Sequence, residues 1–269
     1  MLLQSMIIRR SIMDIVLAFA ASLIPAWLVY MFLVRQDRDK PGYKEDCRRA
    51  FLYGLLTTLP AAGTAIPLYM IGNLAGLSES NIFFQQFYKD VILAAFLEEI
   101  FKLVFSRKVI KKSVTEYSSL DITAYMILVA LGFEVLESVV YLMESGPIHV
   151  IVRGVTMMHG VFGFIMGRFY SRGVRTGKKI WYVLALLVPW IYHGLYDFTL
   201  SQELSGYSDL FIYTPVTLAL LSFILVFVMV GFFLKAKKKE EYTASLRQLG
   251  NGQFIGGQNA DEASESVRA

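Results

Sequence analysis

Apolar residues along the chain gather in long blocks instead of alternating with polar residues. A helix needs about 20 predominantly apolar residues to cross the hydrocarbon layer of a bilayer, and seven blocks approach or reach this length. They lie at residues 12–34, 50–72, 88–106, 121–143, 148–170, 180–200 and 210–234. The pattern therefore predicts an all-α, polytopic transmembrane bundle of about seven, or at most eight, helices.

The two ends of the chain differ in character. The first block resembles a signal peptide, but it runs on to Val34 and then meets a charged segment at residues 35–40. Signal peptides lack such a stop-transfer pattern, so we expect a retained helix. Residues 1–240 are predicted to form one transmembrane domain. Residues 241–269 are rich in polar residues and glycine, a composition that predicts a disordered cytoplasmic tail.

Basic residues alternate between the predicted loops. They cluster at residues 35–49, 107–112, 172–179 and 235–239, whereas residues 73–88, 144–149 and 201–209 contain no Lys or Arg. Basic residues near helix ends are retained on the cytoplasmic side. The alternation predicts an outside N-terminus and a cytoplasmic C-terminus.

The composition agrees with a membrane protein and disfavours nucleic-acid binding and cysteine chemistry. The chain is 55% hydrophobic and 18% charged, with a mean hydropathy of +0.51. The net charge of +4 and the pI near 9.0 are explained by the cytoplasmic loops, so we expect a lipid bilayer and no nucleic acid as partner. The single Cys47 allows no internal disulfide and does not indicate thiolate catalysis.

Adjacent acids in the third block point to function. Glu98 and Glu99 lie in an otherwise nearly apolar stretch, with Lys102 three and four residues later on the same helical face. A carboxylate near the bilayer centre costs several kcal/mol. One acid is expected to pair with the lysine, which leaves the other for proton transfer. A purely structural ion pair would explain one acid and the lysine, but not the second acid.

The fourth block carries two further acids in the pattern F-E-x-x-E, formed by Phe133, Glu134 and Glu137. Their spacing of three residues places both carboxylates on one helical face. Membrane transporters also concentrate acids along proton or cation pathways. A proton- or cation-coupled transporter is therefore an alternative to an enzyme.

Histidines follow in the fifth and sixth blocks. His159 precedes Gly160, Gly163 and Gly167, a spacing of small residues that predicts close helix packing. His193 and Asp197 are four residues apart and share a face, so the carboxylate is expected to orient the imidazole.

Glu99, His159 and His193 are also possible ligands of a divalent metal such as zinc. The sequence contains no H-E-x-x-H, and the candidate residues are dispersed over several blocks. We favour a metal-free site with no cofactor, in which a carboxylate activates water. The sequence contains no G-x-S-x-G and no pair of mid-membrane aspartates, which disfavours serine and aspartyl proteases.

Four features follow one another along the chain: E-E-x-x-K at 98–102, F-E-x-x-E at 133–137, His159 after Arg153, and H-x-x-x-D at 193–197. In this order they resemble the PrsW family, and the resemblance covers about residues 24–200. Members of that family are bacterial membrane proteases that make the first cut in a membrane-anchored anti-sigma factor. They are related to CAAX prenyl proteases and bacteriocin-processing enzymes. Lys102 stands where the prenyl proteases have arginine, which favours the PrsW branch.

The resemblance implies roles for these residues. Glu98 or Glu99 would activate the attacking water, and the other would be held by polar neighbours. His159, His193 and Asp197 would surround the substrate carbonyl, and Glu137 with Glu134 would complete the site. The implied function is a glutamic-type intramembrane endopeptidase of the bacterial cytoplasmic membrane. It would cut a single-span, anti-sigma-factor-like protein near the membrane boundary, with a CAAX-type prenyl protease as a further alternative.

Overall fold

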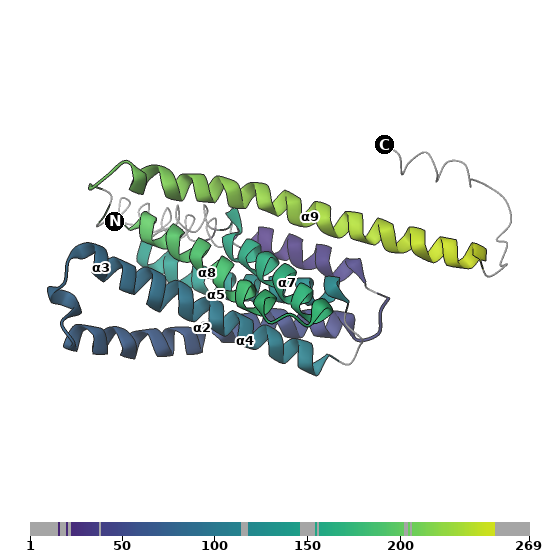
Figure 1. Cartoon of the computed structure of the whole chain (residues 1–269), viewed down its shortest axis with the longest axis horizontal. Coiled ribbons are helices and arrows are strands. Elements are labelled where there is room, and N and C mark those ends of the chain that lie inside the picture. Colours follow the sequence, from purple (N-terminus) through teal and green to yellow (C-terminus); the bar gives the residue numbers. More distant parts are fainter. Residues whose placement is uncertain are drawn as a thin grey trace, which may run out of the picture. The chain divides into compact units, whose positions relative to one another are not determined.

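The computed structural model describes residues 16, 20, 23–37, 39–113, 118–145, 154, 156–201, 204 and 206–250, and this part of the chain contains helices and no strands. The elements run along the chain as shown in Figure 1. They are a helix at Leu23–Gln36, α2 (Tyr43–Leu74), the short 3₁₀ turn η1 (Leu77–Glu79), α3 (Ile82–Gln86), the π-helical η2 (Phe87–Phe96), α4 (Leu97–Lys112), α5 (Ser119–Ser145), α7 (Met158–Thr176), α8 (Ile180–Leu200) and α9 (Leu210–Gly250).

Each predicted apolar block overlaps one of these helices, so the all-α expectation is confirmed for the described residues. Within the described residues, four helices are long and apolar enough to cross a membrane by length and composition: Tyr43–Leu74, Ser119–Val139, Ile180–Leu200 and Leu210–Lys239. The number of spans and the orientation of the termini stay predictions.

The fifth block was expected at residues 148–170, whereas α7 runs from Met158 to Thr176. Residues 146–153, including Arg153, lie outside the described residues. The chain divides into two compact units, Met1–Val230 and Gly231–Ala269. Most of the predicted tail, residues 251–269, also lies outside the described residues.

Helix α5 is the central element of the first unit. Every residue from Asp121 to Glu134 is buried, and α5 packs against α2, α4 and α7. A helix that is apolar on all sides is stable only when it is covered on all sides. The acids near the middle of α5 are therefore enclosed by its neighbours.

Glycines allow the neighbours of α5 to approach closely. A Cβ at Gly54 of α2 would lie 2.1 Å from the carbonyl oxygen of Val129, and one at Gly132 would lie 2.1 Å from that of Phe51. On the other side of α5, a Cβ at Gly163 of α7 would lie 2.7 Å from the carbonyl oxygen of Met126. These crossings bring backbones together, as small residues do between transmembrane helices.

Polar contacts tie the same helices together at one end. Lys40 pairs with Asp121 at the start of α5. Asp46 of α2 accepts hydrogen bonds from Arg49 and from the hydroxyl of Ser113, just after α4, both at 2.7 Å. This end fixes α2, α4 and α5 relative to one another.

A π-helical segment precedes the paired glutamates. Chain residues 82–112 form one continuous helical run, in which η2 widens the helix before α4 begins at Leu97. The indole of Trp190 on α8 donates a hydrogen bond to the carbonyl oxygen of Val91 at 2.8 Å, and Gly194 packs against the Val91 side chain. Such segments often occur at functional sites, and here this one attaches α8 next to Glu98 and Glu99.

Replacing Gly54 by alanine should separate α2 from α5, because the new methyl group would overlap the Val129 carbonyl. We expect a loss of about 1–3 kcal/mol of stability. Thermal unfolding of the detergent-purified protein measures this as a lower midpoint. Gly63→Ala on the same helix is the matched control, since a Cβ at that position would meet nothing within 4 Å. Equal midpoints for the two variants would contradict the close crossing.

Candidate active site

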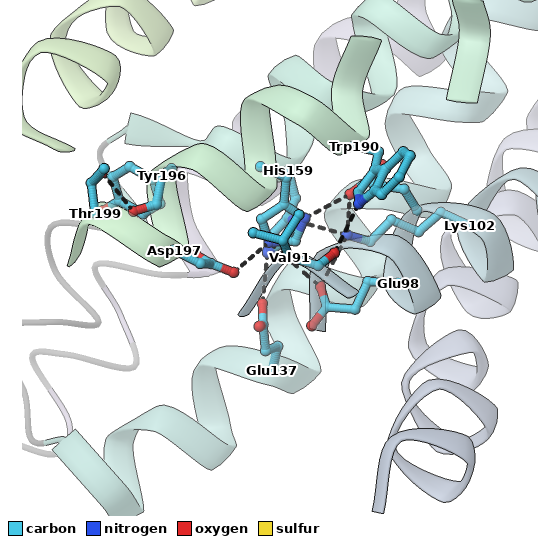
Figure 2. Close-up of polar contacts among 11 residues, drawn as sticks. Val91, Glu98, Lys102, Glu137, His159, Trp190, Tyr196, Asp197 and Thr199 are labelled. Carbon is cyan, nitrogen blue, oxygen red and sulfur yellow. Dashed lines mark hydrogen bonds and ion pairs between the residues drawn. The ribbon is translucent and has the colours of Figure 1, made fainter. Parts of the chain in front are cut away.

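Side chains of α4, α5, α7 and α8 converge in one cluster of polar contacts (Figure 2). All nine residues singled out in the sequence lie in or beside this cluster. They are Glu98, Glu99 and Lys102 on α4, Phe133, Glu134 and Glu137 on α5, His159 on α7, and His193 and Asp197 on α8.

Lys102 connects the cluster. Its ammonium lies 2.8 Å from Glu99 Oε1, 3.4 Å from Glu98 Oε2 and 2.8 Å from His159 Nδ1. It also sits over the ring of Phe133, 4.0 Å from the centroid. The lysine side chain is 1% exposed, so its three hydrogens find acceptors inside the protein. An ammonium has three donors and no acceptor, which makes His159 Nδ1 the acceptor.

His159 is consequently fixed in one tautomer. Its Nδ1 accepts from Lys102, so the ring hydrogen is on Nε2 and is donated to Glu137 Oε2 at 2.7 Å. Phe133 and Phe162 contact the ring edge-to-face. The ring is thus held by polar contacts at both nitrogens and by aromatic packing.

Carboxylates face both nitrogens of His193. Nδ1 lies 3.1 Å from Glu99 Oε1, and Nε2 lies 3.0 Å from Asp197 Oδ2 and 3.8 Å from Glu98 Oε2. The hydrogen-bond pattern is complete when both nitrogens carry hydrogen. The doubly protonated ring carries a positive charge near Glu98, which is an arrangement that can stabilise a developing negative charge.

Glu98 and Glu99 have different surroundings although they are neighbours in the chain. The Glu99 side chain is fully buried and contacts Lys102 and His193. Glu98 is 14% exposed and lines a cavity of about 410 Å³ together with Glu137 and Phe133. Of the two adjacent acids, only Glu98 meets this cavity.

A second, much smaller cavity of about 10 Å³ is lined by both histidines. Its polar lining consists of Glu134, His159, His193 and Asp197. A space of this size with several polar partners suits a single water molecule. Glu134 lines this smaller cavity and does not line the larger one.

Two contributors were missed in the sequence. Phe162 stacks on the imidazole of His193 with centroids 4.9 Å apart, and Trp190 anchors α8 to η2. Phe162 lies three residues after His159, and this spacing, which places it on the histidine's face, was the available signal. Nothing in the sequence marks the π-helical geometry that exposes the Val91 carbonyl to Trp190.

The donor atoms of Glu98, His159 and His193 lie within 4.8 Å of one another, as in a metal-binding group. Glu99 behind His193 also resembles the carboxylate that orients a zinc-bound histidine. However, the Lys102 ammonium contacts both Glu98 and His159 Nδ1. Metal binding at His159 Nε2 would place the ring hydrogen on Nδ1, against that ammonium. As arranged, these residues do not fit a metal ion.

Comparison with known proteins gives one consistent family. Residues 48–232 match the family described as "PrsW family intramembrane metalloprotease". The chain is 31% identical over 181 residues to Protease PrsW of Halalkalibacterium halodurans, which covers 66% of this chain and 80% of that protein. It is 28% identical to Protease PrsW of Bacillus subtilis over 65% of this chain and 78% of the relative. No solved structure matches the chain.

Lys102→Met should destabilise the protein strongly, because it removes the ammonium that lies 2.8 Å from the buried Glu99 carboxylate. Removing one partner of a buried ion pair costs about 3–5 kcal/mol. The double variant Lys102→Met with Glu99→Gln should recover part of this loss, since the buried charge is also removed. Thermal unfolding in detergent provides the measurement.

Lys108→Met is the matched control, because this lysine is exposed and its ammonium lies over the ring of Phe105. We expect a change below about 1 kcal/mol for it. If Lys102→Met behaved like Lys108→Met, the central role of the buried ammonium would be refuted.

Proposed function

The chain belongs to the PrsW protease family, and we propose that it is a glutamic-type intramembrane endopeptidase in which Glu98 activates water without a metal ion. The family is described as one of metalloproteases; the metal-free part of the proposal is supported instead by the Lys102 ammonium, which contacts Glu98 and His159 Nδ1. The proposal rests on the different surroundings of the two adjacent glutamates. Glu99 is occupied by Lys102 and His193, whereas Glu98 faces a cavity large enough for a peptide.

In the proposed reaction, water beside Glu98 gives a proton to its carboxylate as the water oxygen attacks the substrate carbonyl carbon. The carbonyl oxygen becomes negatively charged and is stabilised by the positive charge of the doubly protonated His193 ring, whose two N–H groups are held by Glu99 and Asp197. Glu98 then passes the proton to the leaving nitrogen, and the carbon–nitrogen bond breaks. The products are a carboxylic acid and an amine, so atoms and charge balance.

Glu137 and Lys102 support this chemistry without transferring the proton. Glu137 holds the Nε2 hydrogen of His159, and Lys102 keeps a positive charge beside the acids. The ammonium favours negative charge on the carboxylates and on the intermediate. We therefore assign Lys102, Glu99, Glu137 and Asp197 as positioning residues.

Family membership favours a protease over the transporter interpretation. We propose a single-span, anti-sigma-factor-like protein of the bacterial cytoplasmic membrane as substrate, cut near the outer boundary. The segment between α2 and α3, residues 75–81, supports this location because it contains no Lys or Arg, as expected of an outer loop. This segment is close in the chain to Met70 and Lys89, which line the larger cavity.

Glu98→Gln should abolish cleavage with little loss of stability, since the amide keeps the shape but cannot take the proton. Removing a general base typically costs about 10²–10⁴-fold in rate. A pulse-chase of a tagged candidate anti-sigma factor measures this as accumulation of the full-length substrate. Glu99→Gln and His193→Ala should also accumulate it, whereas Glu45→Gln, on the exposed pair with Arg48, should not. Undiminished processing by all three site variants would refute the assignment.

Chelators should leave the activity of the purified protein unchanged, because metal binding at His159 Nε2 would place the ring hydrogen on Nδ1, against the Lys102 ammonium. The measurement is peptide cleavage in detergent or nanodiscs with EDTA or 1,10-phenanthroline, followed by addition of Zn²⁺. Loss of activity that Zn²⁺ restores would overturn the metal-free proposal while leaving the peptidase assignment intact.

A further inference from the structure

The larger cavity is a groove with two helical walls. One wall is a single face of α2, with lining residues spaced three and four apart. These are Thr58, Ala61, Ala62, Ala65, Ile66, Tyr69 and Met70. The other wall comes from η2 and α4, through Lys89, Leu93, Ala94 and Glu98, and Phe133 and Glu137 of α5 complete the lining.

The dimensions suit an extended peptide. The α2 wall covers twelve residue steps from Thr58 to Met70, which correspond to about 18 Å of helix. A strand rises about 3.3 Å per residue, so about five extended residues match the length of the wall.

Lys89 gives the groove a polar end. Its side chain is exposed and lines the groove, and no carboxylate of the described chain pairs with it. The other charged lining residues, Glu98 and Glu137, belong to the catalytic cluster. The groove thus combines an apolar path past Ala61, Ala62 and Ala65 with one available positive charge at the end opposite the catalytic glutamates.

We propose that Lys89 selects substrates that carry an acidic side chain about four residues from the scissile bond. The nine steps from Lys89 to Glu98 correspond to at most about 14 Å of helix, and four extended residues cover about 13 Å. The intervening substrate residues are small or aliphatic, because the groove walls between the two charges are apolar. This inference rests on the proposed function, since it takes Glu98 as the point of cleavage.

A peptide library tests the inference with the purified full chain in nanodiscs. Each member has a central run of Ala, Val and Leu with one Asp, Lys or Ser at a varied position, and mass spectrometry gives the cleavage sites and rates. The wild type should prefer Asp over Lys about four residues from the cut, by about tenfold in kcat/KM. Lys89→Glu should reverse the preference to Lys at the same position, and Lys89→Gln should remove it.

Lys111→Glu is the matched control, because Lys111 is an exposed lysine near the other end of the same helical run and does not line the groove. It should keep the wild-type preference. Cleavage that depends on Glu98 but shows the same preference in wild type and Lys89→Glu would overturn the role of Lys89 alone. Absence of Glu98-dependent cleavage for every peptide would contradict the proposed function as well.

Discussion

The site depends on one buried ammonium. Lys102 lies within 3.4 Å of Glu98, Glu99 and His159, and these groups would be costly to bury separately. A cation shared among acceptors from two helices offsets part of that cost only when each acceptor is close. The same contacts decide the tautomer of His159 and hold Glu99 against His193. One lysine therefore determines both the packing and the protonation pattern of the cluster.

Such a cluster requires helices that approach closely enough to exclude lipid and most water. Glycines provide this on both sides of α5, at Gly54 and Gly132 toward α2 and at Gly163 toward α7. Larger residues would widen these crossings and move α2 and α7 away from α5. The buried charges thus require the close helix packing that the glycines allow.

The sequence was sufficient for the helices and for the membership of the cluster, because long apolar blocks and intramembrane acids are strong signals. Glu98, Lys102, His159 and His193 were recognisable for that reason. The contacts between them were not, since spacing along one helix does not give the rotation of its neighbours. In the sequence Glu99 was the carboxylate considered for a metal group, whereas the described group contains Glu98. The π-helical geometry of η2 was also beyond prediction, because no residue type or spacing in Phe87–Phe96 distinguishes it from an α-helix.

Two adjacent glutamates cannot share one environment on a helix. Successive residues point about 100° apart, since 3.6 residues make one turn, so a helix at the wall of a cavity turns one acid inward and the other toward the cavity. Here the inward acid is Glu99, beside Lys102 and His193, and the acid at the cavity is Glu98. An E-E pair thus supplies a fixed acid that orients the histidine and an accessible acid that can accept a proton. This asymmetry arises from helix geometry, and the packing of α4 against α5 and α8 decides which glutamate takes each role.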